Sequence, residues 1–443
     1  MTTTLPELIK KQRWFGAKSR TISDVEILDS GELPGTGSLL TLLSVQYLEG
    51  PADTYFVPLM GASDGVSDPA TCAALLSLIE KETRLPTLRG YIQGRRSTGY
   101  VNSDSPLEPR LVKAEQSNSS IIFGDRLIMK LFRRQQPGEN PDCEISRYLT
   151  EHTEFRRIPP FAGSIDYYSG TGETHTLAML QRLVRNDGDG WEWTLQQIAA
   201  GDRARNSMLQ AADTLGRRTA EMHAALATFA PEALAAADLR KLGSEMTQRA
   251  TATLARLDRT LPNPLQNQQA LLTYDRLKDL DPSSLRIRIH GDYHLGQVLR
   301  VPDDFVILDF EGEPTISLAA RRAKHCPLKD VAGMLRSFSY ASYTGLPDDE
   351  MRRREWEQSV SAAFLEAYRK EAGQASFLPA DEDAFQTLLE AYVFDKAFYE
   401  LNYEMDNRPA WLRIPLAAIS EGARATRAGE LLRAVTIQTE PEA

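Results

Sequence analysis

Residues Ile289–Leu299, IHGDYHLGQVL, place two histidines, an aspartate and a glutamine in a strand-like run with apolar ends. Asp292 precedes Gln297 by five positions and Asp309, in ILDFEGE, by seventeen. Another strand-like run, Phe305–Leu308, leads into Asp309. Phosphoryl-transfer enzymes use this order for an aspartate that orients the attacking hydroxyl, an amide residue that binds metal, and a strand-end aspartate that holds Mg²⁺. The stretch therefore predicts Asp292 as catalytic base and Gln297 and Asp309 as metal ligands.

Two charged residues upstream strengthen this prediction, because HGD by itself equally fits a buried structural hydrogen-bond network. Lys130 lies in the apolar run LIMKLFRR, where an ammonium facing a core is unfavourable unless it meets anions. Glu144, fourteen residues on, falls in a predicted helix, NPDCEISRYL. Kinases hold the α- and β-phosphates with such a strand lysine and helix glutamate. We predict that this pair binds nucleotide, although each residue alone also fits a solvated surface position.

A polar loop, Gln116–Ser120, joins the predicted strands Leu111–Ala114 and Ile121–Phe123. Hydroxyl, amide and backbone N–H donors of such a loop can cradle phosphates. Ser117, Asn118, Ser119 and Ser120 are therefore candidates for nucleotide binding. An ordinary hairpin turn explains the same composition.

Composition excludes several classes of function. The 443 residues include 61 acidic and 51 basic side chains, a net charge of −10, and no basic patch stands out, so nucleic acid is not an expected partner. Three widely spaced cysteines suggest neither disulfides nor a zinc site. No apolar run approaches the roughly 20 residues that a membrane helix needs. We expect a cytoplasmic protein with no membrane contact.

The hydrophobic period changes along the chain. Before Asp187 it favours strands, with helices at Thr4–Phe15, Pro69–Glu82 and Asn140–Thr150, and a linker or loop at Gly90–Ser105. Beyond Asp187 it favours helices, interrupted at Arg286–Val306. The predicted helices there are Arg203–Ala227, Leu239–Leu257, Val331–Tyr343, Glu350–Glu371 and Asp381–Tyr403. A strand-rich part followed by a helix-rich part predicts the α+β class.

Five segments together resemble the bacterial maltokinase family, in the aminoglycoside-phosphotransferase branch of the protein kinase-like fold. They are QRWFGAKSR, HGDYHLGQVL, DFEGEP, PLKDVAGMLRSFSYA and FDKAFYELNYEMDNRPAWLRIPL. The resemblance implies a bilobal protein kinase-like fold with an N-terminal cystatin-like cap subdomain. It implies a cap at residues 1–88, an intermediate β-rich subdomain at 89–185, and a helical C-lobe at 186–443.

The same resemblance implies the reaction: transfer of the γ-phosphoryl group of ATP, with Mg²⁺, to the anomeric hydroxyl of maltose, giving maltose 1-phosphate for glycogen and α-glucan synthesis. It leaves open a complex with a trehalose-to-maltose isomerase. It assigns supporting roles to His290 and Glu311, whereas His294 reads as structural. Trp14 and Phe15, in the RWFG segment, have no assigned role and could be core residues of the cap.

The sugar site is predicted on one helix. Lys396, Tyr399, Glu400 and Tyr403 are spaced so that all four share a helix face, where two rings can stack on a sugar and two charged groups can bond its hydroxyls. The resemblance favours this role. Without it, the pattern favours an amphipathic helix with core tyrosines and a surface Lys396–Glu400 bridge.

Two other functions compete with this reading. One is a kinase for another small acceptor, such as glucosamine or an aminoglycoside, and an acidic acceptor pocket would favour an amino sugar. The other is a binding module on a catalytically dead kinase fold. Retention of Lys130, Glu144, Asp292 and Asp309 argues against the second, because buried charge without a function is unfavourable.

Overall fold

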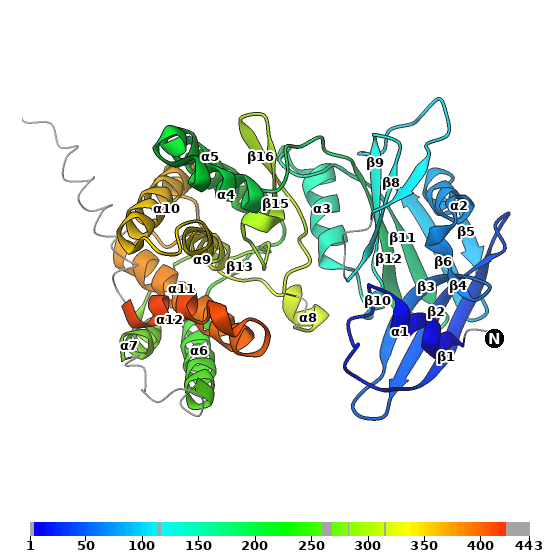
Figure 1. The fold of residues 1–443 in the computed structure, drawn as a ribbon, viewed down its shortest axis with the longest axis horizontal. Helices are drawn as coiled ribbons and strands as arrows, with labels where there is room; N and C mark the ends of the chain where they lie inside the picture. Colours follow the sequence, from blue (N-terminus) through cyan, green and yellow to red (C-terminus); the bar gives the residue numbers. More distant parts are fainter. Residues whose placement is uncertain (1–3, 113–116, 258–267, 282, 314–315, 422–443) are drawn as a thin grey trace, which may run out of the picture. The chain divides into compact units, whose positions relative to one another are not determined.

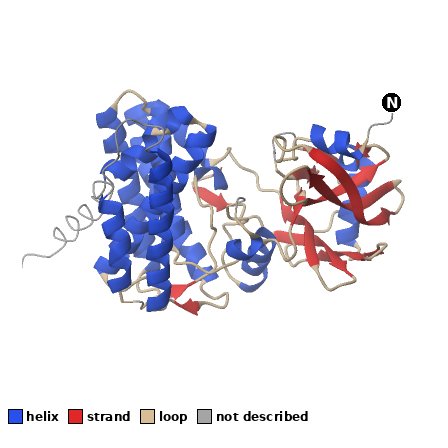
Figure 2. Ribbon diagram, turned by 90° about the horizontal axis from the view of Figure 1, so that it is seen from below, coloured by secondary structure: helices blue, strands red, loops and turns tan. Residues whose placement is uncertain are grey.

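The computed structural model describes residues 4–112, 117–257, 268–281, 283–313 and 316–421. The chain forms two compact units: the first runs to Arg185 and includes residues 316–321, and the second takes the remainder (Figure 1). Strands gather in the first unit and helices in the second (Figure 2). The predicted α+β class is confirmed.

The described residues of the first unit form two antiparallel sheets. One has the strand order β1-β2-β3-β10, with β4 paired to β3; its strands are Ile22–Leu33, Ser38–Tyr47, Asp53–Met60, Arg134–Gln135 and, for β4, Ser63–Asp64. The other has the order β5-β6-β11-β12-β9-β8-β7. In that order its strands are Arg84–Pro86, Gly90–Arg96, Phe161–Ser169, Thr174–Arg182, Leu127–Leu131, Ser119–Phe123 and Pro109–Leu111.

The helices of this unit begin where the sequence offers caps. In α2 (Pro69–Glu80), the Asp68 side chain accepts a hydrogen bond from Thr71 N and Pro69 occupies the first turn. In α3 (Pro141–His152), Asn140 accepts one from Asp142 N. The other helical segments are α1 (Leu5–Lys11), η1 (Gly65–Ser67) and α8 (Leu318–Arg321).

Two large clusters of buried side chains lie in the described part of the first unit, besides a small one made of Phe132, Cys143, Phe161 and Met179. One joins α2 to residues of both sheets, among them Leu40, Phe56 and Ile121. The other packs α1 and the RWFG segment against Val45, Tyr55 and neighbouring residues of the first sheet. Trp14 is 6% exposed and Phe15 is 0% exposed, so both aromatic residues of RWFG are core residues.

The second unit is mainly helical. Its long helices are α4 (Gly190–Ala200), α5 (Arg205–Leu226), α6 (Ala236–Leu257), α9 (Leu328–Gly345), α10 (Glu350–Ala372) and α11 (Glu382–Asn407). The shorter ones are η2 (Gly201–Ala204), α7 (Gln268–Arg276), η3 (Leu277–Asp279), η4 (Leu295–Gln297), η5 (Pro409–Trp411) and α12 (Arg413–Glu421). Two small antiparallel pairs interrupt them: β13 (Glu232–Ala233) with β14 (Leu285–Arg286), and β15 (Val298–Val301) with β16 (Asp304–Ile307). The five helices predicted beyond Asp187 are all present, with ends shifted by a few residues; α4, α7 and α12 were not predicted.

The prediction of a linker or loop at Gly90–Ser105 is wrong for its first half. Gly90–Arg96 is strand β6, which pairs with both β5 and β11. Gly94 is there for packing, because a Cβ at this position would lie 2.1 Å from the carbonyl oxygen of Leu78 in α2. Glycine therefore marks a close approach of backbones here and not a flexible connection.

The predicted boundaries at residues 88 and 185 stay predictions. Strands β5 and β6 pair across the first of them, and β10 returns to pair with β3. In the strand predicted at Leu111–Ala114, Lys113 and Ala114 lie outside the described residues, and β7 ends at Leu111.

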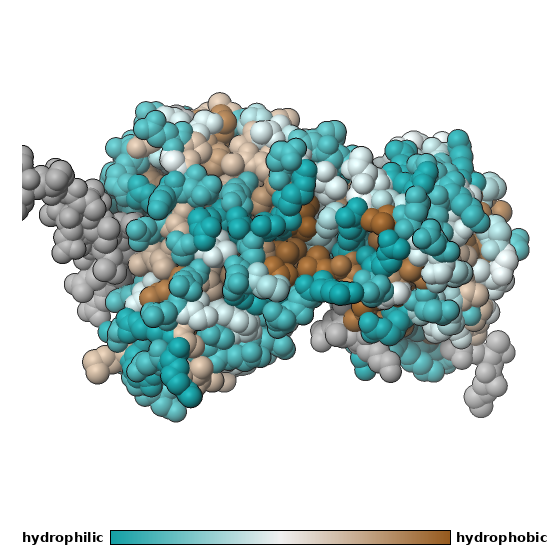
Figure 3. Space-filling view, turned by 90° about the horizontal axis from the view of Figure 1, so that it is seen from above, coloured by the Kyte–Doolittle hydropathy of each residue, from teal (hydrophilic) through white to brown (hydrophobic). Residues whose placement is uncertain are grey.

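Hydrophilic residues predominate on the face of the molecule shown in Figure 3. In the part of the chain that the structure describes, no helix combines the length and the apolar character needed to cross a bilayer.

Candidate active site

In the first unit, the predicted nucleotide lysine contacts an acid that sequence analysis did not select. Lys130, in β9, places Nζ 3.3 Å from Oδ2 of Asp142, a buried residue in the first turn of α3. Glu144 is buried on the same helix. An acid in a first helical turn is usually read as a partner of the helix dipole, so the sequence alone could not single out Asp142. The pairing of Lys130 with Glu144 stays a prediction.

The predicted phosphate loop is shorter than expected. Ser119 and Ser120 are not loop residues but the first residues of β8, paired with Leu131 and Lys130 of β9. The reason is that their backbone groups join the strand ladder, which composition does not reveal. Ser117 and Asn118 precede the strand, and Gln116 lies outside the described residues. Nucleotide binding by all four stays a prediction.

A buried arginine connects the start of β8 to the RWFG segment. Arg133 is 0% exposed; its Nε donates to Ser119 Oγ at 2.9 Å and its Nη2 donates to Asp64 Oδ2 at 2.8 Å. Trp14 Nε1 donates to the same carboxylate oxygen at 3.0 Å. Sequence analysis missed this network, because its bonded partners are 14 to 69 positions apart.

In the second unit, the two predicted metal ligands flank one hairpin. Gln297 ends η4 just before β15, and Asp309 follows β16 by two residues. Antiparallel pairing of β15 with β16 brings them together, and Gln297 Nε2 donates to Asp309 Oδ2 at 3.0 Å. Asp309 has φ +63°, a left-handed conformation that aspartate tolerates better than most residues. Amide and carboxylate oxygens are hard donors that suit Mg²⁺.

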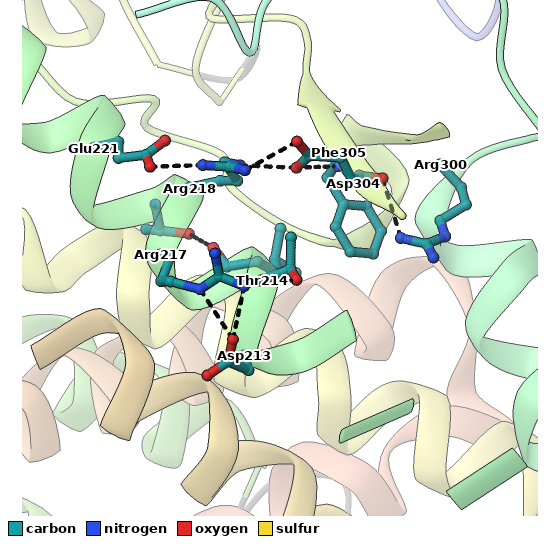
Figure 4. A network of polar contacts seen from close by, with 10 residues as sticks. Asp213, Thr214, Arg217, Arg218, Glu221, Arg300, Asp304 and Phe305 are labelled. Carbon is teal, nitrogen blue, oxygen red and sulfur yellow. Dashed lines mark hydrogen bonds and ion pairs between the residues drawn. The ribbon is translucent and has the colours of Figure 1, made fainter. Parts of the chain in front are cut away.

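Helix α5 anchors this hairpin (Figure 4). Arg218 donates from Nε and Nη2 to the two carboxylate oxygens of Asp304, at 2.8 and 3.0 Å, and from Nη1 to Glu221. Arg300 donates to the backbone carbonyl of Asp304 at 3.1 Å. A bidentate arginine–carboxylate pair fixes direction as well as distance. The residues that carry Gln297 and Asp309 are thereby held against the helical body.

A buried aspartate holds the backbone of the loop that carries Asp292. Asp330, near the start of α9, accepts hydrogen bonds from the backbone N–H groups of His290 and Gly291, at 2.8 and 2.9 Å. His290 Nε2 lies 2.7 Å from the carbonyl oxygen of Leu308 and so links this loop to the strand end before Asp309. His294 Nδ1 accepts from Gly296 N, and burial lowers the pKa of His294. A neutral, hydrogen-bonded His294 agrees with the structural role predicted for it.

Lys396 of α11 reaches the predicted catalytic base. Its Nζ lies 3.2 Å from Asp292 Oδ1 and 2.9 Å from Glu313 Oε1. Burial by itself would raise the pKa of Asp292, but the charge of Lys396 outweighs it, so this pKa lies below its ordinary value. Burial disfavours the charged lysine, yet Asp292 and Glu313 raise the pKa of Lys396. Both groups are therefore charged at neutral pH.

Replacing Lys396 by Met is expected to move the acidic limb of the kcat–pH profile to higher pH. Burial raises the pKa of Asp292, and Lys396 is the largest of the influences that lower it, ahead of His294 and His290, so protonation should occur at higher pH without the lysine charge. The titration of ATP is the same for both enzymes and cancels in the comparison. Initial rates of ADP release from pH 4.5 to 8.5 measure the shift, and superimposable limbs would contradict the electrostatic role of Lys396.

The other predicted sugar-binding residues do not have the contacts expected on the surface of an amphipathic helix. Glu400 is buried, and its Oε2 accepts from Nε and Nη2 of Arg336 at 3.0 and 2.8 Å. The helix does not form a surface bridge between Lys396 and Glu400, because Lys396 contacts Asp292 and Glu313 and Glu400 contacts Arg336. Tyr399 has its ring 4.7 Å from Lys396 Nζ, and Tyr403 is 43% exposed. Sugar binding by these four residues stays a prediction.

Comparison with protein-family models places two matches on this chain. A phosphotransferase enzyme family matches residues 110–312, and a maltokinase N-terminal cap domain matches residues 9–83. The first match includes Lys130, Asp292 and Asp309. The predicted kinase-like fold with an N-terminal cap is confirmed.

Two curated relatives are similar over most of their length. A glucosamine kinase of Streptacidiphilus jiangxiensis is 26% identical over 323 residues, which covers 70% of this chain and 73% of that protein. One from Mycolicibacterium smegmatis is 27% identical over 326 residues, covering 70% and 78%. A solved glucosamine kinase in complex with glucosamine, ADP and inorganic phosphate aligns with a TM-score of 0.68 at 23% identity, over 95% of this chain and 99% of that one. At this identity the structural likeness supports the shared fold alone.

Proposed function

Since this chain belongs to the maltokinase-like, aminoglycoside phosphotransferase-like kinases, we propose that it phosphorylates the anomeric hydroxyl of maltose with ATP. The product would be maltose 1-phosphate, a donor for α-glucan and glycogen synthesis. The coarser activity, ATP-using phosphotransfer, follows from the family. The choice of maltose rests on the cap match and on the charge pattern around Asp292.

Asp292 takes the proton in this mechanism. Within the described residues, Lys396 is the only side chain that donates to its carboxylate, and it does so at Oδ1. Oδ2 is left to accept a hydrogen bond from the sugar hydroxyl. The hydroxyl oxygen attacks the γ-phosphorus, the bond to the β–γ bridging oxygen breaks, ADP departs, and the hydroxyl proton passes to Asp292.

Other residues of this chain hold the nucleotide. Gln297 and Asp309 would bind Mg²⁺, which when present neutralises charge on the phosphates. Lys130, which contacts Asp142, would bind nucleotide phosphates, with Glu144 and the segment Ser117–Ser120 contributing to the same task. The kinase family supports ATP as the phosphoryl donor.

The carboxylates around Lys396 and Arg336 are already paired with these cations, which favours a neutral acceptor. Asp292 and Glu313 share Lys396, and Glu400 is bound by Arg336. A protonated amine on a sugar would need a carboxylate of its own and would meet the ammonium of Lys396. Neutral hydroxyls can bond both charged groups without this conflict. A kinase for an amino sugar is the second candidate, favoured by the names of the two similar curated relatives.

An acceptor panel tests the proposal. We expect kcat/KM for maltose to exceed that for glucosamine by at least about 100-fold, equivalent to ~2.7 kcal/mol of differential transition-state binding. Purified protein is incubated with Mg-ATP and maltose, glucose, glucosamine or kanamycin, and ADP release is followed. Phosphorus NMR of the product distinguishes an anomeric phosphate from a 6-phosphate. Preference for glucosamine would establish the second candidate, and nucleotide binding without ADP release for any acceptor would point to a binding module.

A further inference from the structure

Glu313 is not among the predicted ligands of metal, nucleotide or sugar. It nevertheless lies closer to Lys396 than Asp292 does. Its Oε1 lies 2.9 Å from Lys396 Nζ, and its side chain is 10% exposed. Among the described residues, Lys396 is the only cation within salt-bridge distance of Glu313. A buried carboxylate with one cationic partner is strongly tied to that partner, because either charge left alone in this environment is unfavourable.

The loop that presents Glu313 also presents the metal ligand Asp309. It turns at Gly312, which has φ +72°, and it packs against the Asp292 loop at Gly291, which has φ +86°. A Cβ on Gly291 would lie 3.3 Å from Gly312 Cα, so glycine allows the two loops to approach closely. Asp292 and Glu313 thus reach one ammonium from two adjoining loops.

Lysine needs this second anion because its side chain has four flexible bonds and no preferred direction of bonding. A single contact with Asp292 would leave Nζ free to exchange between the two carboxylate oxygens. With Glu313 bound as well, Nζ is held at Oδ1 of Asp292, which leaves Oδ2 for the acceptor hydroxyl in the proposed mechanism. Small errors in the placement of reacting groups lower rates strongly.

We propose that Glu313 is a positioning residue for phosphoryl transfer, which acts by holding Lys396 on Oδ1 of Asp292 so that Oδ2 receives the acceptor hydroxyl. The inference rests on the role of Asp292 proposed above. It predicts that Glu313 matters for turnover only while Lys396 is present.

A double-mutant cycle tests this dependence, with the best acceptor of the panel as substrate. Glu313→Gln keeps the shape and removes the charge; we expect kcat to fall about 10- to 100-fold with KM for ATP unchanged. In the Lys396→Met background the same replacement should change kcat by less than about twofold, because Glu313 then has no lysine to hold. Equal effects of Glu313→Gln in both backgrounds would overturn the proposal. If Lys396→Met does not fold, Lys396→Gln replaces it in the cycle.

Glu404→Gln is the matched control. Glu404 is also a buried glutamate bound to a cation, Arg408 at 2.8 Å, but that cation does not contact Asp292. We expect a similar change in thermal midpoint for both glutamate variants and a loss of kcat only for Glu313→Gln. Equal kcat values for Glu313→Gln and Glu404→Gln would refute the positioning role. Wild-type turnover of Asp292→Asn would instead reject Asp292 as the base. The cycle would then report only whether Glu313 acts through Lys396.

Discussion

Asp292→Asn is expected to lower kcat by about 10²- to 10⁴-fold, because an amide cannot accept the proton that the sugar hydroxyl releases. The fold should persist, since Lys396 keeps its contact with Glu313 and the backbone of the loop keeps its bonds to Asp330. The KM for ATP should stay close to that of the wild type. Initial rates of ADP release at saturating sugar measure the effect.

Asp213→Asn provides a surface control for this variant. Asp213 pairs with Arg217 one turn along α5, with 51% of its side chain exposed, and such pairs contribute little to stability. Its kcat should match the wild type. Retention of full turnover by Asp292→Asn, with an unchanged thermal midpoint in both proteins, would reject Asp292 as the base.

Asp309→Asn is expected to lower Mg²⁺-dependent turnover by about 10³-fold or more, equivalent to ~4 kcal/mol, because the substitution removes the proposed charged ligand of the metal. Asparagine is the appropriate replacement, since Asp309 has φ +63° and asparagine tolerates the left-handed region almost as well as aspartate. Alanine would lower turnover through backbone strain as well as through loss of the carboxylate, so the two effects could not be separated. Calorimetric titration with Mg-ATP and rates over a Mg²⁺ series measure the change.

The chain offers a matched control on the same hairpin. Asp303 also has a positive φ, +55°, and lies exposed at the turn between β15 and β16. Asp303→Asn should leave both Mg-ATP affinity and kcat at wild-type values. Wild-type Mg-ATP affinity in Asp309→Asn as well would show that the carboxylate does not hold the metal.

Local patterns in the sequence were sufficient for much of this protein. The kinase-like spacing of Asp292, Gln297 and Asp309 predicted a common site, and a short hairpin brings Gln297 Nε2 to 3.0 Å from Asp309 Oδ2. Hydrophobic periodicity located the long helices, as for α5, predicted at Arg203–Ala227 and observed at Arg205–Leu226. Such features depend on neighbours within a few residues, so the sequence carries them directly.

Where the composition of a segment fitted two kinds of local structure, the secondary structure predicted from it was wrong. Gly90–Arg96 looked like a linker because glycine marks both flexible turns and close backbone contacts. Only the packing of β6 against α2 distinguishes the two. Ser119 and Ser120 looked like loop residues for a related reason, since serine is common in turns but also joins a strand when the ladder requires it.

What the sequence determined by itself was the order and identity of the chemical groups and the helices and strands that carry them; what the tertiary structure decided was which charges meet. Lys396 meets Asp292 across 104 positions and Glu313 across 83, and Arg336 meets Glu400 across 64. Periodicity shows that a residue lies on one face of a helix, but the partner opposite that face is set by packing of distant elements. Burial then makes each pairing decisive, because a charge removed from water is stable only beside the opposite charge that the fold supplies.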